Sequence, residues 1–266
     1  MAAIMEADNI TAGYGRRVII DHQTLTIPAG KITGLIGPNG SGKSTLFNVL
    51  NGFESPMSGD IKLFGEPISQ FSHRKRAQKI ACLPQQPAAA AGITVSELVS
   101  YGRYCHRRGL NRLSKKDHQI IDEAITAVHL DEFKEHIVSN LSGGQRQRAF
   151  VAMTLAQDSP IMMLDEPTTY LDLTNQLDIL NLLKDLNENY HKTIIVILHD
   201  LNQAAQYCDH LICLVDGEIK ATGNPTDVIT SDVLADIFKV RADIIYDKCT
   251  NCPQILNCQS LAGSGG

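Results

Sequence analysis

The feature that most constrains this chain is the glycine-rich stretch 37–44, whose sequence Gly-Pro-Asn-Gly-Ser-Gly-Lys-Ser matches the pattern G-x-x-x-x-G-K-[ST]. Residues 31–36 before it are a short β-branched, apolar run, which predicts a buried strand. Residues 45–50 after it have the pattern of the first turns of a helix. Between a strand and a helix, such glycines turn backbone N–H groups inward, and the helix N-terminus adds partial positive charge. The stretch therefore predicts a site for nucleotide phosphates.

The residue types within this stretch have separate expected roles. In such a site Lys43 reaches the β- and γ-phosphate oxygens, and the hydroxyl of Ser44 holds Mg²⁺. A glycine-rich turn with a chance lysine is the alternative interpretation, and the flanking strand and helix disfavour it. The residues expected to bind the nucleotide are Gly37, Pro38, Asn39, Gly40, Ser41, Gly42, Lys43, Ser44 and Thr45.

Length and composition limit the other possibilities. The 266 residues can form one large domain or two small ones, and 43% hydrophobic with 20% charged residues is ordinary for a soluble globular protein. The formal net charge of −5 argues weakly against a general polyanion binder, so no nucleic-acid partner is expected. No apolar run approaches the roughly 18–20 residues that cross a bilayer, and the first residues do not form a signal peptide. A membrane role is therefore expected to come through a partner.

The order of the predicted elements indicates an α/β fold. Residues 4–27 carry β-rich runs around a Gly-Tyr-Gly turn, which predicts antiparallel strands. Further along, the pattern is a strand at 161–164, a helix at about 175–188, a strand at 193–198 and a helix from Asp200. Near-continuous apolar strands that alternate with helices predict a parallel sheet covered on both faces.

A largely helical region is expected between these parts, from residue 87 to about residue 160. Residues 94–97 and 114–117 have the spacing of capping boxes, in which a Ser or Thr and an acidic residue satisfy each other's backbone N–H groups. They predict helices that run through Tyr104 and about Val128.

An acidic pair follows the strand predicted at 161–164. Asp165 and Glu166 come at its carboxyl end, which is where open α/β sheets place their ligands. Asp165 is expected to hold Mg²⁺, and Glu166 to act as the general base that activates the attacking water. If the chain lacked the glycine-rich stretch 37–44, the simpler interpretation would be a strand that ends in surface acids.

A second helix N-terminus that can bind an anion is predicted at residues 141–145, Leu-Ser-Gly-Gly-Gln. Ser142 and Gln145 have capping-box spacing, and the two glycines leave the N–H groups of the helix start open. One chain hardly needs two such starts for one phosphate. We therefore expect two copies to associate head to tail, so that this helix start closes on the γ-phosphate bound by the other copy.

Taken in order, these motifs resemble those of the ATP-binding cassette subunit of ABC transporters, over almost the whole chain. The glycine-rich stretch matches the Walker A motif of that family, residues 141–145 match its signature motif, and Ile161–Asp165 with Glu166 match its Walker B motif. Residues 171–172, Leu-Asp, match the D-loop, and His199 matches the switch histidine. Five motifs in the family's order leave little room for chance.

The resemblance assigns roles to further residues. Tyr14 matches the aromatic residue that stacks on adenine. Gln85 matches the Q-loop glutamine, which senses the metal and the attacking water, so Ser44, Gln85 and Asp165 are the implied Mg²⁺ ligands. His199 is expected within reach of the γ-phosphate. The implied catalytic residues are Glu166, His199 and Gln85, and the implied nucleotide-binding residues now include Ser142, Gly143, Gly144, Gln145 and Asp172.

The resemblance also implies an architecture and partners. The expected fold is a P-loop core with a mostly parallel sheet, an N-terminal antiparallel β subdomain and a helical subdomain at about 87–157. The ATP-binding domain would cover 1–245, and 246–266 would be a cysteine-containing tail. Two copies would bind two ATP with Mg²⁺ and drive integral-membrane permease subunits, which serve a periplasmic or lipoprotein substrate-binding protein. The chain would lie peripherally on the cytoplasmic face of the plasma membrane.

The kind of transporter is suggested by finer similarities. Residues 92–103, 141–150 and 198–204 are similar to the importers of iron siderophores, haem and cobalamin, and ferric citrate and other ferric chelate systems are nearest. The alternative is a soluble ABC-type ATPase of iron–sulfur assembly or regulation. A non-enzymatic nucleotide-binding module is disfavoured because Glu166, Gln85 and His199 are all present.

The seven cysteines fall into two groups. Four lie singly in apolar or helical contexts and are expected to be small buried side chains in a reduced, cytosolic chain. The other three could bind zinc or an iron–sulfur cluster, but a fourth ligand and a clear hairpin frame are lacking. A variable tail with exposed thiols is therefore favoured. The first group is Cys82, Cys105, Cys208 and Cys213, and the second is Cys249, Cys252 and Cys258.

Overall fold

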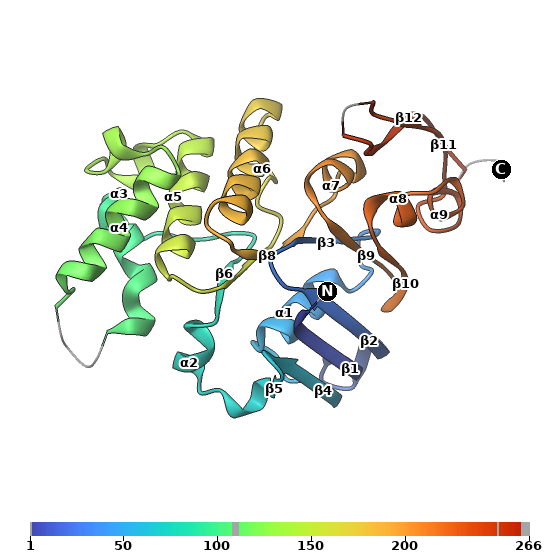
Figure 1. The fold of residues 1–266 in the computed structure, drawn as a ribbon, viewed down its shortest axis with the longest axis horizontal. Helices are drawn as coiled ribbons and strands as arrows, with labels where there is room; N and C mark the ends of the chain where they lie inside the picture. Colours follow the sequence, from blue (N-terminus) through green and yellow to red (C-terminus); the bar gives the residue numbers. More distant parts are fainter. Residues whose placement is uncertain (1, 108–111, 249, 262–266) are drawn as a thin grey trace. The chain divides into compact units, whose positions relative to one another are not determined.

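The computed structural model describes residues 2–107, 112–248 and 250–261 (Figure 1). The chain divides into two compact units. The first unit consists of Met1–Gln70 and Ile195–Gly266, and the second consists of Phe71–Ile194.

An antiparallel sheet begins the first unit, as predicted. Its strand order is β2-β1-β4-β5, with β1 pairing antiparallel to both β2 and β4. Alternate residues of β1, such as Met5 and Ala7, are buried, as expected for a sheet with one face on a core. The strands are β1 (Ala3–Tyr14), β2 (Arg17–Pro28), β4 (Ser58–Leu63) and β5 (Glu66–Pro67), and the short helical turn η1 (Ile68–Gln70) follows.

The remaining strands of this unit form the predicted parallel arrangement. Strand β3 pairs parallel with β9, and β10 pairs antiparallel with β9. The backbone N of Leu198, just after β8, donates to Leu35 O at 3.2 Å. The elements are β3 (Ile32–Ile36), α1 (Lys43–Asn51), β8 (Thr193–Ile197, of which Ile195 onward belongs to this unit), α7 (Leu201–Tyr207), β9 (His210–Val215), β10 (Glu218–Gly223), α8 (Pro225–Val228) and α9 (Ser231–Asp236).

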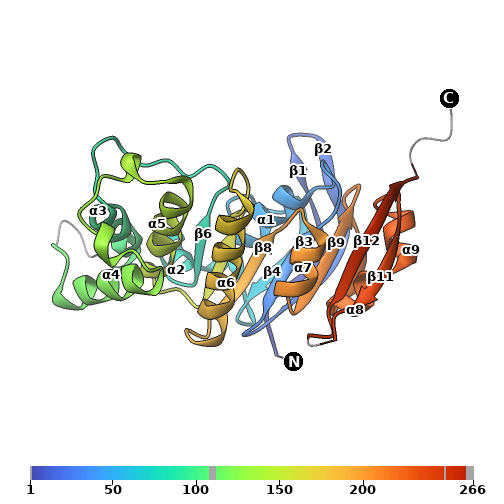
Figure 2. The ribbon, with the colours of Figure 1, turned by 90° about the horizontal axis from the view of Figure 1, so that it is seen from above.

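The first unit ends in a β-hairpin, which Figure 2 shows beside α8 and α9. Strands β11 (Val240–Tyr246) and β12 (Pro253–Ser260) pair antiparallel. Asn202 of α7 accepts from Ile255 N at 2.7 Å and donates to Ile255 O at 3.2 Å. The sequence pattern does not predict this hairpin, because the contact that holds it comes from a helix 53 residues away.

The second unit combines a pair of parallel strands with helices, as predicted. Strands β6 and β7 pair in parallel from Ile80 opposite Ile161 to Leu83 opposite Leu164. Helix α5 packs against α3 and α4. The elements are α2 (His73–Ala77), β6 (Ile80–Leu83), α3 (Val95–Ser100), η2 (Tyr101–His106), α4 (Lys115–Ala127), η3 (Asp131–Phe133), η4 (Val138–Asn140), α5 (Gly143–Ala156), β7 (Ile161–Leu164) and α6 (Leu173–Glu188).

All three predicted capping boxes are present, at Thr94, Ser114 and Ser142. The helix that follows Thr94 is shorter than predicted, since α3 ends at Ser100 and the chain continues as the tighter 3₁₀ helix η2. A Cβ at Gly102 would stand 2.2 Å from Met153 O. The close approach of η2 to the backbone of α5 therefore requires glycine at this point.

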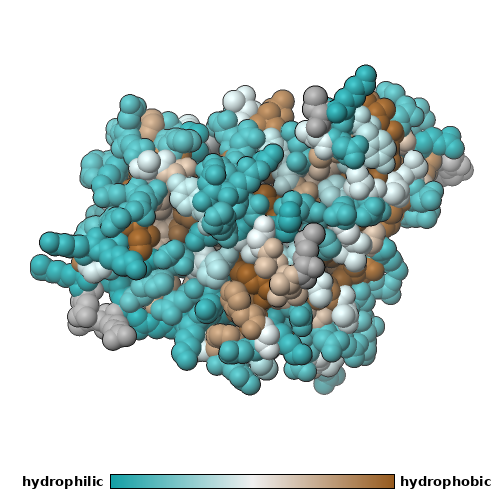
Figure 3. All heavy atoms as spheres, viewed as in Figure 1, coloured by the Kyte–Doolittle hydropathy of each residue, from teal (hydrophilic) through white to brown (hydrophobic). Residues whose placement is uncertain are grey.

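Among the described residues, no helix combines the length and the apolar character that crossing a bilayer requires. On the face seen in Figure 3, hydrophobic side chains are scattered among hydrophilic ones.

Candidate functional site

The glycine-rich stretch of the first unit, residues 37–45, is named here the phosphate loop. It connects β3 to the first turn of α1. Gly37, Gly40 and Gly42 have φ values of 144°, 77° and 102°. A Cβ at Gly37 would stand 2.0 Å from Leu214 O. Side chains at position 37 are thus excluded by both conformation and space, which leaves the backbone free to turn its N–H groups toward one centre.

Lys43 spans this loop. The residue is only 6% exposed. Its Nζ donates to Gly37 O and Pro38 O, both at 2.9 Å. The Ser41 hydroxyl is buried without a hydrogen-bond partner among the described residues. Ser44 is exposed at the start of α1 and Thr45 is buried. A buried ammonium group and an unsatisfied hydroxyl at a helix start suit a phosphate ligand.

The turn between β9 and β10 contacts the phosphate loop through a backbone hydrogen bond. Gly217 N donates to Ser41 O at 2.9 Å. Asp216 and Gly217 have φ values of 47° and 81°, as a type I′ hairpin turn requires. A Cβ at Gly217 would stand 1.7 Å from Ile19 O. The sequence motif does not reveal this contact, which depends on strands about 180 residues further along the chain.

The first unit also contains two other predicted residues. Tyr14 ends β1 and is 48% exposed, so its ring is open to a ligand. His199 follows β8 and is exposed. Asp200 caps α7 by accepting from Gln203 N at 2.9 Å, which fixes the chain direction immediately after His199.

The second unit brings Gln85 and Glu166 together. Gln85 follows β6 and Glu166 follows β7, and Gln85 Nε2 donates to Glu166 Oε2 at 2.6 Å. Thr169 Oγ1 donates to the same oxygen at 3.1 Å. Asp165 N donates to Leu83 O at 2.9 Å, so the parallel pairing extends to the acidic pair. Glu166 has a φ of 49°, a conformation that non-glycine residues adopt mainly in turns and at functional sites.

Residues 142–145 of the same unit open α5, named here the signature helix. Ser142 Oγ accepts from Gln145 N at 3.2 Å, and Gln145 Oε1 accepts from Ser142 N at 3.0 Å. Ser142 and Gly143 are exposed. The box satisfies these two N–H groups, and the exposed backbone of Gly143 remains for an anion, whereas Gly144 is buried.

The D-loop, Leu171–Asp172, leads into α6. Asp172 caps this helix by accepting from Asn175 N at 2.8 Å. Asp172 itself is exposed.

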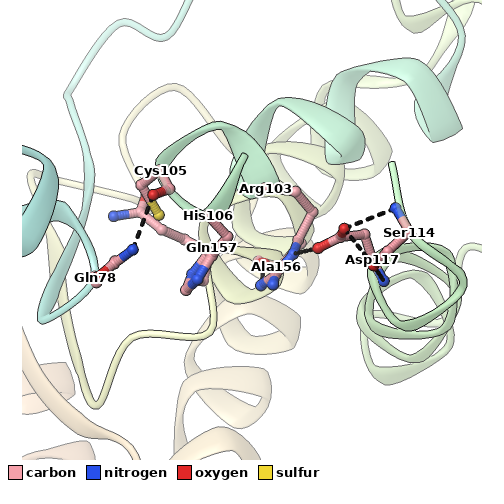
Figure 4. A network of polar contacts seen from close by, with 8 residues as sticks. All are labelled: Gln78, Arg103, Cys105, His106, Ser114, Asp117, Ala156 and Gln157. Carbon is pink, nitrogen blue, oxygen red and sulfur yellow. Dashed lines mark hydrogen bonds and ion pairs between the residues drawn. The ribbon is translucent and has the colours of Figure 1, made fainter. Parts of the chain in front are cut away.

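The other end of the signature helix is held by a network of polar contacts (Figure 4). The buried Arg103 donates to Ala156 O at 2.8 Å and to Asp117 Oδ1 at 2.9 Å. His106 Nε2 donates to Gln157 O at 2.8 Å. Side-chain N–H donors on the last carbonyls, the guanidinium of Arg103 among them, suit the negative end of the helix dipole. Burial raises the pKa of Asp117, but hydrogen bonds from Ser114 and then from Arg103 outweigh it and lower this pKa to about 2.

The predicted site residues thus fall into two groups, one in each unit. The loop 37–45, Tyr14 and His199 belong to the first, and Gln85, residues 142–145, Asp165, Glu166 and Asp172 belong to the second. The motifs did not indicate Thr169 or Asn175, whose contacts depend on tertiary packing.

The cysteines of the hairpin do not form a shared metal site in the described residues. Cys252 immediately precedes β12, and Cys258 lies within it. Six residues of extended chain place the two about 20 Å apart. Among the residues with described positions, no group of three His, Cys, Asp or Glu side chains is close enough to hold a metal. Cys249 lies outside the described residues. Of the four other cysteines, Cys105, Cys208 and Cys213 are buried as predicted, and Cys82 is half-buried.

Comparison with known proteins identifies relatives along nearly the whole chain. Residues 20–169 match the model of the ABC transporter family. The petrobactin import ATP-binding protein of Bacillus anthracis is 44% identical, over 95% of this chain and 93% of its own length. The iron(3+)-hydroxamate import ATP-binding protein of Bacillus subtilis is 43% identical, over 95% and 94%. The ferric enterobactin transport ATP-binding protein of Escherichia coli is 41% identical, over 96% and 94%.

Solved structures agree with this result. A metal-chelate type ABC transporter in an inward-facing conformation superposes with a TM-score of 0.83 at 26% identity, over 96% of this chain and 97% of the other. A dimeric ATP-binding cassette in a post-hydrolysis state with ADP and phosphate superposes with a TM-score of 0.72 at 30% identity, over 83% and 98%.

Proposed function

The chain belongs to the ABC transporter family, and we propose that it is the ATP-hydrolysing subunit of an importer for ferric siderophores or related iron chelates. As an ATPase of this family it binds ATP, for which the first unit offers the phosphate loop. Lys43 is the proposed ligand of the β- and γ-phosphates, and Tyr14 of the adenine. His199 is the proposed contact to the γ-phosphate.

Glu166 is the proposed general base. A carboxylate with one oxygen held by both Gln85 and Thr169 has a fixed orientation, which is what abstraction of a proton from water requires. Ser44 and Asp165, with Gln85, supply oxygen donors of the type that Mg²⁺ prefers. When bound, this ion would neutralise charge on the phosphates.

The signature helix is the proposed contact to a nucleotide held by another copy. Its exposed start can offer N–H groups to a γ-phosphate, in addition to those of the phosphate loop that precedes α1. A head-to-tail pair of chains gives each nucleotide both kinds of contact. ATP would then close the pair, and hydrolysis would release it.

The observation that carries the cargo class is the 41–44% identity to iron-chelate import subunits over at least 95% of this chain. The alternative, a soluble ATPase of iron–sulfur assembly or regulation, has no comparable support. Permease subunits in the membrane and, through them, a substrate-binding protein are the proposed partners, with this chain on the cytoplasmic face. The proposed ATP-binding domain is 1–245, with a helical subdomain at about 87–157. The cysteine-containing segment from 246 is attached to it through the pairing of β12 with β11.

Uptake in cells tests this proposal. A strain without this gene should lose accumulation of radiolabelled iron supplied as a ferric siderophore and regain it with the wild-type chain. The matched control is Glu166→Gln, which should be expressed and bind ATP but restore no uptake. Unchanged iron accumulation in the deletion strain, together with lost uptake of cobalamin, would assign the transporter to a different cargo.

A further inference from the structure

Asn175, in the first turn of α6, contacts both the D-loop and the signature helix within the second unit. Its backbone N and its side-chain Nδ2 each donate to Asp172 Oδ1 at 2.8 Å. Its Oδ1 lies so close to Gly144 that a Cβ on that residue would stand 1.8 Å away. One amide group therefore joins the D-loop carboxylate to the backbone at the start of the signature helix.

This contact explains why residue 144 is glycine. Glycine inside a helix costs about 1 kcal/mol relative to alanine, so its presence needs a reason. Gly144 has no left-handed backbone conformation to provide one. Its neighbour Gly143 has room, since a Cβ there would meet only Leu171 Cδ2 at 3.7 Å. The requirement at residue 144 is thus the space that the Asn175 amide occupies.

Two further contacts lie nearby, one within the D-loop and one between α5 and α6. Gln176 Nε2 donates to Leu171 O at 2.9 Å, which fixes the backbone of the D-loop. About one turn further along both helices, Arg148 Nη1 lies 3.6 Å from Asp178 Oδ2. Among these residues, Asn175 is the one that contacts Gly144, at the end of the signature helix that is proposed to bind the phosphate.

We propose that Asn175 is a positioning residue for ATP hydrolysis, which sets the start of the signature helix relative to the D-loop. The inference rests on the proposed function, in which this helix start meets a γ-phosphate bound by another copy. A displacement of about 1 Å at such a contact can reduce a rate a hundredfold. The effect is expected in steps that need two copies, because Asn175 contacts the D-loop and the signature helix, which is proposed to act on the nucleotide of another copy.

The test is the near-isosteric Asn175→Asp variant, in the chain reconstituted with its permease. The change removes the Nδ2 donor and puts a second carboxylate beside Asp172 and a negative charge at the phosphate-seeking helix start. We expect kcat to fall on the order of ten- to a hundredfold. The ATP affinity of the isolated chain should stay unchanged. The matched control is Asn181→Asp, the same chemical change at an exposed residue of α6, which should keep kcat.

A second variant tests the link itself. Asp172→Asn combined with Asn175→Asp restores one carboxylate–amide pair with the partners exchanged, so its kcat should exceed that of Asn175→Asp alone. Equal kcat for Asn175→Asp and Asn181→Asp would overturn the proposal, as would loss of ATP affinity in the isolated Asn175→Asp chain. Failure of the proposed function is distinct, because the isolated wild-type chain would then hydrolyse ATP at a rate per chain that does not depend on its concentration.

Discussion

Gln85 donates a 2.6 Å hydrogen bond to Glu166, and the two residues follow neighbouring parallel strands of the second unit. The parallel register of β6 and β7 ends with Leu83 opposite Leu164, so the residues after both strands reach the same edge. A residue proposed to sense the nucleotide thus contacts the proposed base directly. Movement of the segment around Gln85 changes the surroundings of that base, which offers a physical route from a membrane partner to hydrolysis.

Thr169 should contribute to hydrolysis through Glu166. Its hydroxyl donates to Glu166 Oε2 at 3.1 Å, so Thr169→Val removes a donor that orients this carboxylate while keeping the branched shape of the side chain. We expect kcat to fall about tenfold or more and KM for ATP to change little. The control is Thr169→Ser, which keeps the hydroxyl and should keep most of the rate. Equal kcat in the valine variant and the wild type would show that Gln85 alone suffices.

Gly37 should be required for nucleotide binding by a single chain. A Cβ at this position would stand 2.0 Å from Leu214 O at a φ of 144°, so Gly37→Ala must displace the loop or the β9 backbone. We expect the affinity for a fluorescent ATP analogue to fall at least tenfold, on the order of the loss of one good phosphate contact. The matched control is Gly30→Ala, where φ is 67° and nothing lies within 4 Å of the added Cβ. That variant should cost about 1–2 kcal/mol of stability and leave affinity unchanged.

Asp117, which accepts hydrogen bonds from Ser114 and Arg103, should make stability depend on pH in the acid range. The pKa of Asp117 is lowered to about 2 in the folded chain from an ordinary value of 3.8. A lowered pKa stabilises the fold above the unfolded value and loses this contribution as pH falls toward 2. The contribution is about 2 kcal/mol. Denaturant unfolding should therefore show Asp117→Asn less stable than the wild type at pH 6. This gap in the free energy of unfolding should narrow between pH 4 and pH 2. A gap that stays constant would contradict the assignment.

Local signals in the sequence were sufficient for much of this fold. The capping boxes at Thr94, Ser114 and Ser142 involve residues three apart, so spacing alone predicts them. The phosphate loop and strand β7 were likewise predictable from short patterns. In each case the atoms that make the structure are neighbours in the chain.

The parts that could not be predicted depend on contacts between distant segments. The bond from Gln85 to Glu166 joins residues 81 apart and needs the register of β6 and β7. The hairpin of β11 and β12 is held by Asn202, which no local pattern relates to Ile255. The contact of Asn175 with Gly144 likewise exists only once α5 and α6 have packed.

The most direct test of the central claim is the rate of single-turnover ATP hydrolysis per chain, measured as the isolated protein is diluted through its dimerisation range. If each nucleotide needs the phosphate loop of one copy and the signature helix of another, the rate per chain should fall toward zero as the pairs dissociate, while bound ATP persists. A rate per chain that stays constant down to monomeric protein would contradict the account.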